Sequence, residues 1–247
     1  MKTKISVIIP FYDNFNLLKR AIYSVQSQSF KNYELIIICD NPDDKENIKL
    51  LKEFVRKKKI KVLINNKNLG AGLSRNKGIR KAKGEFVAFL DSDDIWKKNK
   101  LRIQYDCMKK NNLLISHTSY DLFDENNRFL QKRLARKLNY FDLLKSCDIG
   151  LSTVMVKRKL ILKHKLFPSI KTKEDYVLWL KISKSGISFY GIKKVLTNWT
   201  NRKKSLSKSS FQKIKDAFKV YHKYEKFNFL ESLLKVTILS INFLRKK

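Results

Sequence analysis

Residues 84–94 read GEFVAFLDSDD, an apolar and aromatic run that leads directly into three carboxylates within four positions. The apolar half predicts a buried strand, so the acidic cluster follows a strand end. Carboxylates this close repel one another and lose solvation unless a cation lies among them. Mg²⁺ and Mn²⁺ prefer oxygen ligands and commonly take one or two carboxylates together with substrate phosphate oxygens. The segment therefore predicts either a metal-diphosphate site or a turn in which Asp91 and Asp94 act as caps.

Short apolar runs alternate with helical patterns along the first hundred residues. Strands are predicted at 5–9, 35–38, 60–64 and in the run before Asp91, and helices follow each of the first three. This alternation predicts a parallel sheet with helices on both faces, which binds its ligands beyond the carboxyl ends of the strands. Tyr12, Asp13 and Asp40 follow two of these strands, as the acidic cluster follows another. Their shared location favours the metal-diphosphate interpretation.

The composition is that of a folded and strongly basic chain. Its 247 residues are 43% hydrophobic, enough for one core with or without an appendage, and its formal net charge is +33. The charge attracts anionic surfaces such as nucleic acid or acidic phospholipid, although lysines spread through nearly every predicted helix also fit a general compositional bias. Three cysteines without metal-type spacing indicate a reducing compartment. With no signal-peptide pattern and no apolar run of about 20 residues, we expect a cytoplasmic protein.

Four motifs, in this order and spacing, resemble glycosyltransferase family 2. They are ISVIIPFY (residues 5–12), Asp40, NLGAGLSRNKG (residues 68–78) and DSDD (residues 91–94). The resemblance implies the GT-A fold, which is an α/β fold with a Rossmann-like, mostly parallel sheet and helices on both faces. It implies a GT-A domain at 1–207, with a nucleotide-sugar-binding half at 1–101 and an acceptor half at 102–207. A basic, amphipathic helical extension is expected at 208–247.

The resemblance assigns four residues to the nucleotide. Pro10 and Tyr12 match the strand end that lies along the base in the family, with Tyr12 as a stacking partner. Asp40 matches the second Asp of a base-contacting Asp-Asp pair, whose first member is Cys39 here. Arg75 matches a family Arg that can reach the nucleotide or its phosphates, and a surface Arg on a helix is the alternative.

The same resemblance assigns the acidic cluster. Asp91 matches the position near the ribose and the metal, and Ser92 is assigned with it to nucleotide-sugar binding. Asp93 matches the direct ligand of Mn²⁺ or Mg²⁺. A metal there would neutralise charge on the departing nucleoside diphosphate. We expect Asp94 to cap the helix that contains Leu101.

The Glu174-Asp175 pair precedes a strong helical pattern. Thr172 and Asp175 have the spacing of a helix-capping arrangement, which is one interpretation. The resemblance implies the other, in which Asp175 is the catalytic base. Displacement at the anomeric carbon in one in-line step needs a base that takes the proton of the acceptor hydroxyl.

The second half of the chain has a less regular pattern. A hairpin turn is predicted at 124–127, with Phe129 and Leu130 returning to the core, and further elements are predicted at 138–144, 151–156 and 193–199. Ser205 and Ser207 match two serines of a family loop segment, and Arg202 is a candidate replacement for a cation that the segment otherwise carries.

Apolar residues recur at helical spacing from Phe211 onward, with lysines between them. A packing helix or a dimer contact explains this pattern as well as an amphipathic helix on an anionic bilayer does. Contact with the inner face of the cell membrane would suit a lipid-linked acceptor.

The resemblance implies an inverting, metal-dependent glycosyltransferase that moves a single sugar from a nucleotide-sugar donor, with a UDP-sugar expected. The acceptor would be a saccharide or lipid-linked glycan in cell-surface polysaccharide or lipopolysaccharide biosynthesis. A sugar-nucleotide nucleotidyltransferase is one alternative, but such enzymes usually carry a Gly-rich basic loop where this chain has residues 11–14. A nucleic-acid-binding protein is another, motivated by charge alone and without a recognisable motif. We therefore expect no nucleic-acid partner.

Overall fold

The structure, a computed structural model, describes residues 3–56, 60–202 and 209–245. Strands and helices alternate through the first half as predicted. The elements are β1 (Ile5–Phe11), α1 (Phe15–Gln26), β2 (Tyr33–Cys39), α2 (Lys45–Val55), β3 (Ile60–Ile64), α3 (Ala71–Lys81), β4 (Phe86–Phe89), β5 (Ile95–Trp96) and α4 (Lys100–Lys110).

The second half contains longer strands and shorter helices. Its elements are β6 (Ile115–Asp124), β7 (Phe129–Arg133), α5 (Tyr140–Lys145), η1 (Leu151–Thr153), β8 (Met155–Lys157), α6 (Arg158–Lys163), α7 (Glu174–Lys184), β9 (Tyr190–Asn201), α8 (Ser210–Lys219), the π-helical η2 (Val220–Tyr224) and α9 (Phe229–Leu244).

The described strands form one sheet in the order β3-β2-β1-β4-β8-β6-β9-β5, with β7 paired to β6. Strands β1 to β4 are parallel to one another, whereas β8 runs antiparallel to both β4 and β6, and β6 is parallel to β9. The α/β architecture is confirmed. Parallel pairing dominates the first half, and the second half makes the sheet mixed.

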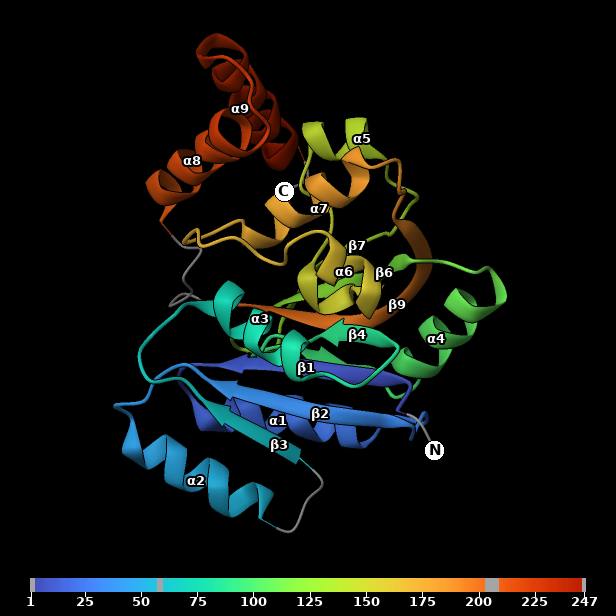
Figure 1. Ribbon diagram of the computed structural model, residues 1–247, viewed down its shortest axis with the longest axis vertical. Helices are drawn as coiled ribbons and strands as arrows, with labels where there is room; N and C mark the ends of the chain where they lie inside the picture. Colours follow the sequence, from blue (N-terminus) through green and yellow to red (C-terminus); the bar gives the residue numbers. More distant parts are fainter. Residues whose placement is uncertain (1–2, 57–59, 203–208, 246–247) are drawn as a thin grey trace.

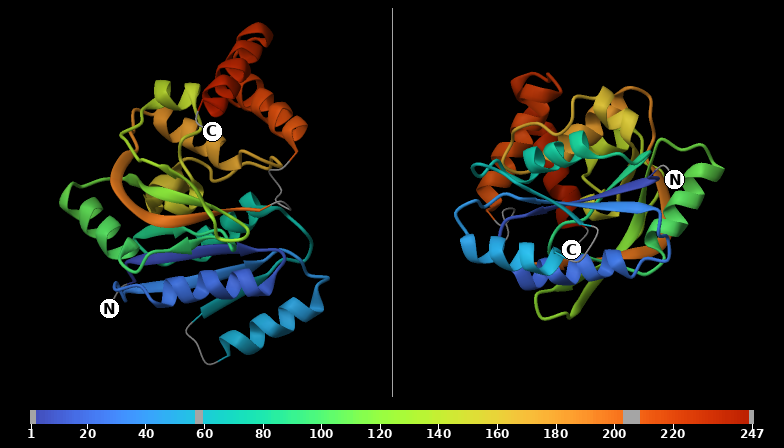
Figure 2. Two further views of the ribbon diagram at one scale, coloured as in Figure 1. Left: turned by 180° about the vertical axis from the view of Figure 1, so that it is seen from behind. Right: turned by 60° about the horizontal axis from the view of Figure 1, so that its bottom comes forward.

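Two apolar cores cover the two faces of the sheet. Ile8 of β1 and Ile38 of β2 face the core that includes α3, α6 and α7. Val7 and Ile9 face the core that includes α1, α2 and α4. Because neighbouring side chains in a strand point to opposite faces, a continuously apolar strand needs helices on both sides. Figure 2 shows α3 on one side of β1 and β2 and the helices α1 and α2 on the other.

Several local predictions for the second half were wrong. Residues 151–153 form a 3₁₀ helix, and the strand begins only at Met155. The hairpin at 124–127 is present, but Phe129 and Leu130 are exposed and do not return to the core. Ser205 and Ser207 lie outside the described residues.

The C-terminal helices lie beyond α5 and α7, on the opposite side of the molecule from α2 and β3 (Figure 1). Helix α9 packs Val236 and Leu239 inward, while much of its remaining surface is apolar and exposed. No helix in the described part of the chain is both long enough and apolar enough to cross a membrane.

Candidate active site

The acidic cluster lies at the carboxyl end of β4, in the loop that leads into β5. The backbone N–H of Asp91 donates to Ser152 Oγ at 3.0 Å, which fixes the start of the loop. Asp93 Oδ2 lies 3.8 Å from Arg202 Nη1, and the same guanidinium lies 3.5 Å from Asp13 Oδ1. The carboxylates of Asp13, after β1, and Asp93, after β4, therefore both lie near the guanidinium of Arg202, which directly follows β9.

The electrostatics of the cluster fit a metal ion. Burial and the nearby Asp91 carboxylate raise the pKa of Asp93 to about 6, although Arg202 opposes the shift. Crowding of this kind is relieved by a cation. Two carboxylates plus phosphate oxygens form a common ligand set for Mg²⁺ or Mn²⁺. Asp91 and Asp93 thus fit such an ion, and the described residues hold no cluster of three or more metal-binding side chains.

Asp94 has a different role from the predicted helix cap. Helix α4 begins at Lys100 and its N-cap, Asn99, makes no side-chain capping bond. Asp94 instead turns inward and is buried, with Oδ1 accepting from the Thr200 N–H at 2.9 Å. Burial and the neighbouring Asp93 and Asp91 raise its pKa. The capping prediction was wrong because a long-range contact with β9 replaced the local one.

Arg75 joins the acidic cluster to the start of α7. Its two terminal nitrogens donate to Asp91 Oδ1 and to Glu174 Oε1, each at 2.6 Å. Burial alone would lower the pKa of Arg75, but the two carboxylates raise it above its ordinary value. Its Nε is buried and has no hydrogen-bond acceptor among the described residues. The surface-Arg alternative is excluded, since only 4% of Arg75 is exposed.

The rest of α3 packs against the segment that leads into α7. A Cβ at Gly72 would lie 2.8 Å from Glu174 Cγ, so only glycine permits this approach without displacement. Asn76 exchanges two hydrogen bonds with the backbone of Phe167, at 2.8 and 3.0 Å. Through these contacts the motif at 68–78 holds Glu174 and the preceding segment against α3.

Asp175 lies in the first turn of α7 and is partly buried. Burial raises its pKa to about 7, with a further increase from Glu174 and a decrease from Arg75. The N-cap residue of the helix is Lys173, and Thr172 bonds to Asp216 instead of to Asp175. The capping alternative for Thr172 and Asp175 is therefore contradicted. A carboxylate with a pKa near neutrality has the properties of a general base.

The residues assigned to the base follow β1 and β2. Pro10 is buried within β1, while Tyr12 is 47% exposed and free to stack on a ligand. Asp40 is buried, and its carboxylate accepts from Asn65 Nδ2 and from the N–H groups of Leu69 and Gly70 at 2.7 to 2.9 Å. Asp40 thus fixes the loop before α3. Its carboxylate keeps only part of its hydrogen-bonding capacity for a ligand.

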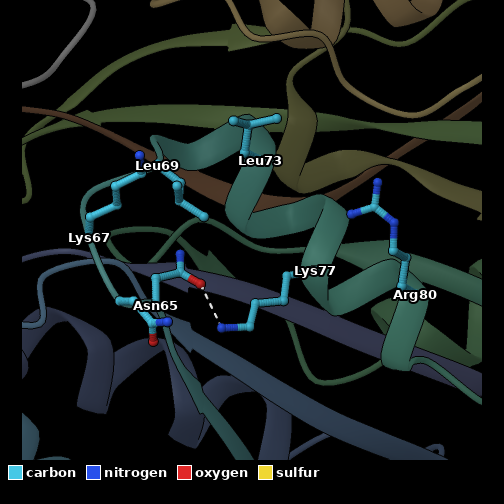
Figure 3. A pocket seen from close by; sticks show the side chains of 7 residues that line it. Asn65, Lys67, Leu69, Leu73, Lys77 and Arg80 are labelled. Atoms are coloured by element: carbon cyan, nitrogen blue, oxygen red, sulfur yellow. Dashed lines mark hydrogen bonds between the residues drawn. The ribbon is translucent and has the colours of Figure 1, made fainter.

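A pocket of about 490 Å³ lies beside this loop (Figure 3). It is lined by Asn65, Asn66, Lys67, Leu69, Leu73, Lys77 and Arg80. None of the predicted site residues lines it, and Lys77 Nζ already donates to Ile64 O and Asn65 Oδ1. The pocket therefore adjoins the Asp40 network and is distinct from the carboxylates.

The structure brings Arg75, Asp91 and the Glu174-Asp175 segment together, with Asp93 beside them, and holds Asp40 in a separate network. Sequence reasoning missed the structural importance of Glu174 and of Ser152. Glu174 could have been found as the acidic neighbour of Asp175, whereas no local pattern marks Ser152.

Comparisons with known proteins identify the family of the chain. The family model described as glycosyl transferase family 2 matches residues 6–167. The chain is 37% identical over 213 residues to an Escherichia coli protein named UDP-Glc:alpha-D-GlcNAc-diphosphoundecaprenol beta-1,3-glucosyltransferase WfgD, covering 85% of this chain and 82% of that one. It is 32% identical over 234 residues to TuaG of Bacillus subtilis (strain 168), whose name refers to a glycosyltransferase of teichuronic acid biosynthesis, covering 94% and 92% of the two chains.

A solved structure has the same fold. The TarS fragment 1–349 of S. aureus, in complex with UDP-GlcNAc, matches with a TM-score of 0.72 at 20% identity, over 94% of this chain and 70% of that one. The matched family model and the two relatives show the family, and the TarS structure shows the fold. The chain is an enzyme of glycosyltransferase family 2 with the GT-A fold.

Proposed function

We propose that this chain is an inverting, metal-dependent glycosyltransferase that moves one sugar from a UDP-sugar to a saccharide or lipid-linked acceptor in cell-surface glycan biosynthesis. The observation that carries the proposal is the double ion pair of Arg75, which joins Asp91 to Glu174. It connects the acidic strand end, suited to a metal and a diphosphate, to the segment that carries a candidate base.

The roles of the residues follow from their environments. Asp91 and Asp93 would hold Mn²⁺ or Mg²⁺, which supplies charge neutralisation for the departing nucleoside diphosphate. Tyr12 is exposed at the end of β1 and is suited to stacking on the base. Asp175, with a pKa near 7, accepts the proton of the acceptor hydroxyl as that oxygen attacks the anomeric carbon. Attack from the face opposite the leaving group inverts the anomeric configuration.

The donor and acceptor classes rest on the relatives. WfgD is named for UDP-Glc and a diphosphoundecaprenol-linked acceptor, and the TarS fragment binds UDP-GlcNAc. These names support a UDP-sugar and a lipid-linked saccharide for this chain, in preference to nucleotidyl transfer or nucleic-acid binding.

A lipid-linked acceptor would bring the enzyme to the inner face of the cell membrane. Support comes from exposed apolar side chains on α8 and α9, among them Phe211, Leu230 and Leu234. The extension at 208–247 also contains ten Lys and Arg against three Asp and Glu. Apolar burial and lysine attraction both favour an anionic bilayer surface. We expect co-sedimentation with anionic vesicles that falls with added salt and in a Leu230→Ser, Leu234→Ser double variant; equal binding to neutral vesicles would contradict this.

Calorimetric titration of UDP tests the metal-diphosphate site. We expect binding that requires Mn²⁺, disappears with EDTA and is largely lost in Asp93→Asn. The matched control is Asp106→Asn, which removes an exposed carboxylate from α4. Transfer from UDP-sugars to lipid-linked acceptors, with NMR of the product's anomeric configuration, then tests inversion. No heat with any nucleoside diphosphate would refute the proposal.

A further inference from the structure

The turn before α7 is held by the C-terminal extension. Asp216 of α8 has a fully buried side chain, and its Oδ2 accepts from both the N–H and the hydroxyl of Thr172, at 3.1 and 2.9 Å. Gln212 Nε2 donates to the same oxygen at 2.9 Å, and Lys219 Nζ lies 3.5 Å from Oδ1. A buried, charge-assisted contact of this kind fixes the Thr172 backbone firmly.

The next residue has an unfavourable backbone conformation. Lys173 has φ of 66°, in the left-handed region. A non-glycine residue in this region is strained and persists only where its surroundings enforce the conformation. Both neighbours of Lys173 are held: Thr172 by Asp216, and Glu174 by Arg75 at 2.6 Å. Asp216 and Arg75 therefore hold the residues immediately before and after Lys173, and together they maintain this strained turn.

The position of Asp175 depends on this turn. Its Oδ1 accepts from the N–H of Tyr176 at 2.7 Å, so the carboxylate is oriented by the first turn of α7, the helix that begins directly after Lys173. We propose that Asp216 is a positioning residue for Asp175, so that the C-terminal extension contributes to the geometry of the reaction. This inference rests on the proposed role of Asp175 as the base.

Other contacts hold α7 as a whole, which makes a selective test feasible. The hydroxyls of Tyr176 and Tyr221 lie 2.9 Å apart, and Lys184 Nζ donates to Glu225 at 3.0 Å. These contacts remain when the Thr172 hydroxyl is removed, so a change at this position loosens the turn without releasing the helix.

The test compares Thr172→Val, Thr172→Ser and Asp216→Asn with the wild-type full chain. The matched control is Thr118→Val, which removes a buried threonine hydroxyl in β6. We measure the melting temperature, the affinity for UDP with Mn²⁺, and kcat and KM for sugar transfer well below the melting temperature. Because a misplaced catalytic group can cost up to about a hundredfold in rate, we expect kcat to fall about tenfold or more in Thr172→Val and Asp216→Asn.

The remaining readouts separate positioning from simple loss of stability. UDP affinity and donor KM should stay near the wild-type values, Thr172→Ser should recover the kcat, and Thr118→Val should leave it unchanged. A folded Thr172→Val variant with wild-type kcat overturns the positioning role alone. A wild-type chain that binds UDP but transfers no sugar overturns the proposed base, and this inference with it.

Discussion

Replacement of Asp175 by Asn should stabilise the protein at alkaline pH while strongly lowering its transfer activity. Burial raises the pKa of this carboxyl from 3.8 to about 7 in the folded chain. The folded state therefore binds the proton more tightly than the unfolded state does. This contribution to stability is complete below pH 3.8 and is lost as the pH rises toward 7. Asn cannot ionise, so the stability of the Asn variant does not fall in this way as the pH rises.

The magnitude follows from the shift. A change of roughly 3 pKa units corresponds to about 4 kcal/mol when the carboxylate is fully ionised, as an upper bound. Part of this penalty is already present at pH 5, so the advantage of the Asn variant should widen by roughly 2 to 3 kcal/mol between pH 5 and pH 8. Comparing the two pH values cancels any constant effect of the amide itself.

Urea unfolding of both proteins at several pH values between 5 and 8 measures this difference. Asp106→Asn, which alters an exposed carboxylate on α4, is the matched control. Transfer activity of Asp175→Asn should fall by about 10²–10⁴-fold, the typical contribution of a general base. An advantage that is the same at pH 5 and pH 8 would refute the raised pKa, and retained activity would refute the role as base.

Three further predictions concern the same site. Gly72→Ala places a Cβ 2.8 Å from Glu174 Cγ and should lower the free energy of unfolding by about 1–3 kcal/mol in urea titrations; an unchanged value would contradict the close approach. Arg75→Met leaves Asp91 and Glu174 without their cation and should cost about 3–5 kcal/mol, measured in the same way, so a neutral effect would mean that the ion pairs do not form. Tyr12→Ala should weaken UDP binding by about 1–3 kcal/mol in calorimetry if its ring stacks on the base, and unaltered affinity would exclude stacking.

The sequence predicted the features that depend on local patterns. Continuous apolar runs identified β1, β2 and β4, because strands buried on both faces carry no alternation. The rule that ligands bind at strand carboxyl ends placed Asp91 and Asp93 at the same edge of the sheet as the ends of β1 and β2. The helix that begins at Glu174 was also predicted correctly, because its apolar residues recur at helical spacing.

The partners of individual side chains could not be predicted in this way. Arg75 and Glu174 are 99 residues apart, and Thr172 and Asp216 are 44 apart. No periodicity encodes such pairs, because they depend on how α3, α7 and α8 pack. Asp94 illustrates the same limit: a local rule predicts a cap, whereas packing of β9 beside the loop provides the Thr200 N–H.

Arg75 and Asp216 hold the same turn from opposite sides, but they differ in what else they hold. Asp216 contacts Thr172 and residues of its own helix, whereas Arg75 also binds Asp91 in the candidate metal-diphosphate site. Loosening the Asp216 contact should therefore change kcat and leave donor KM nearly constant. Loss of Arg75 should change both constants, because one guanidinium couples the donor side to the base. Equal effects of the two changes on donor KM would mean that this coupling does not operate.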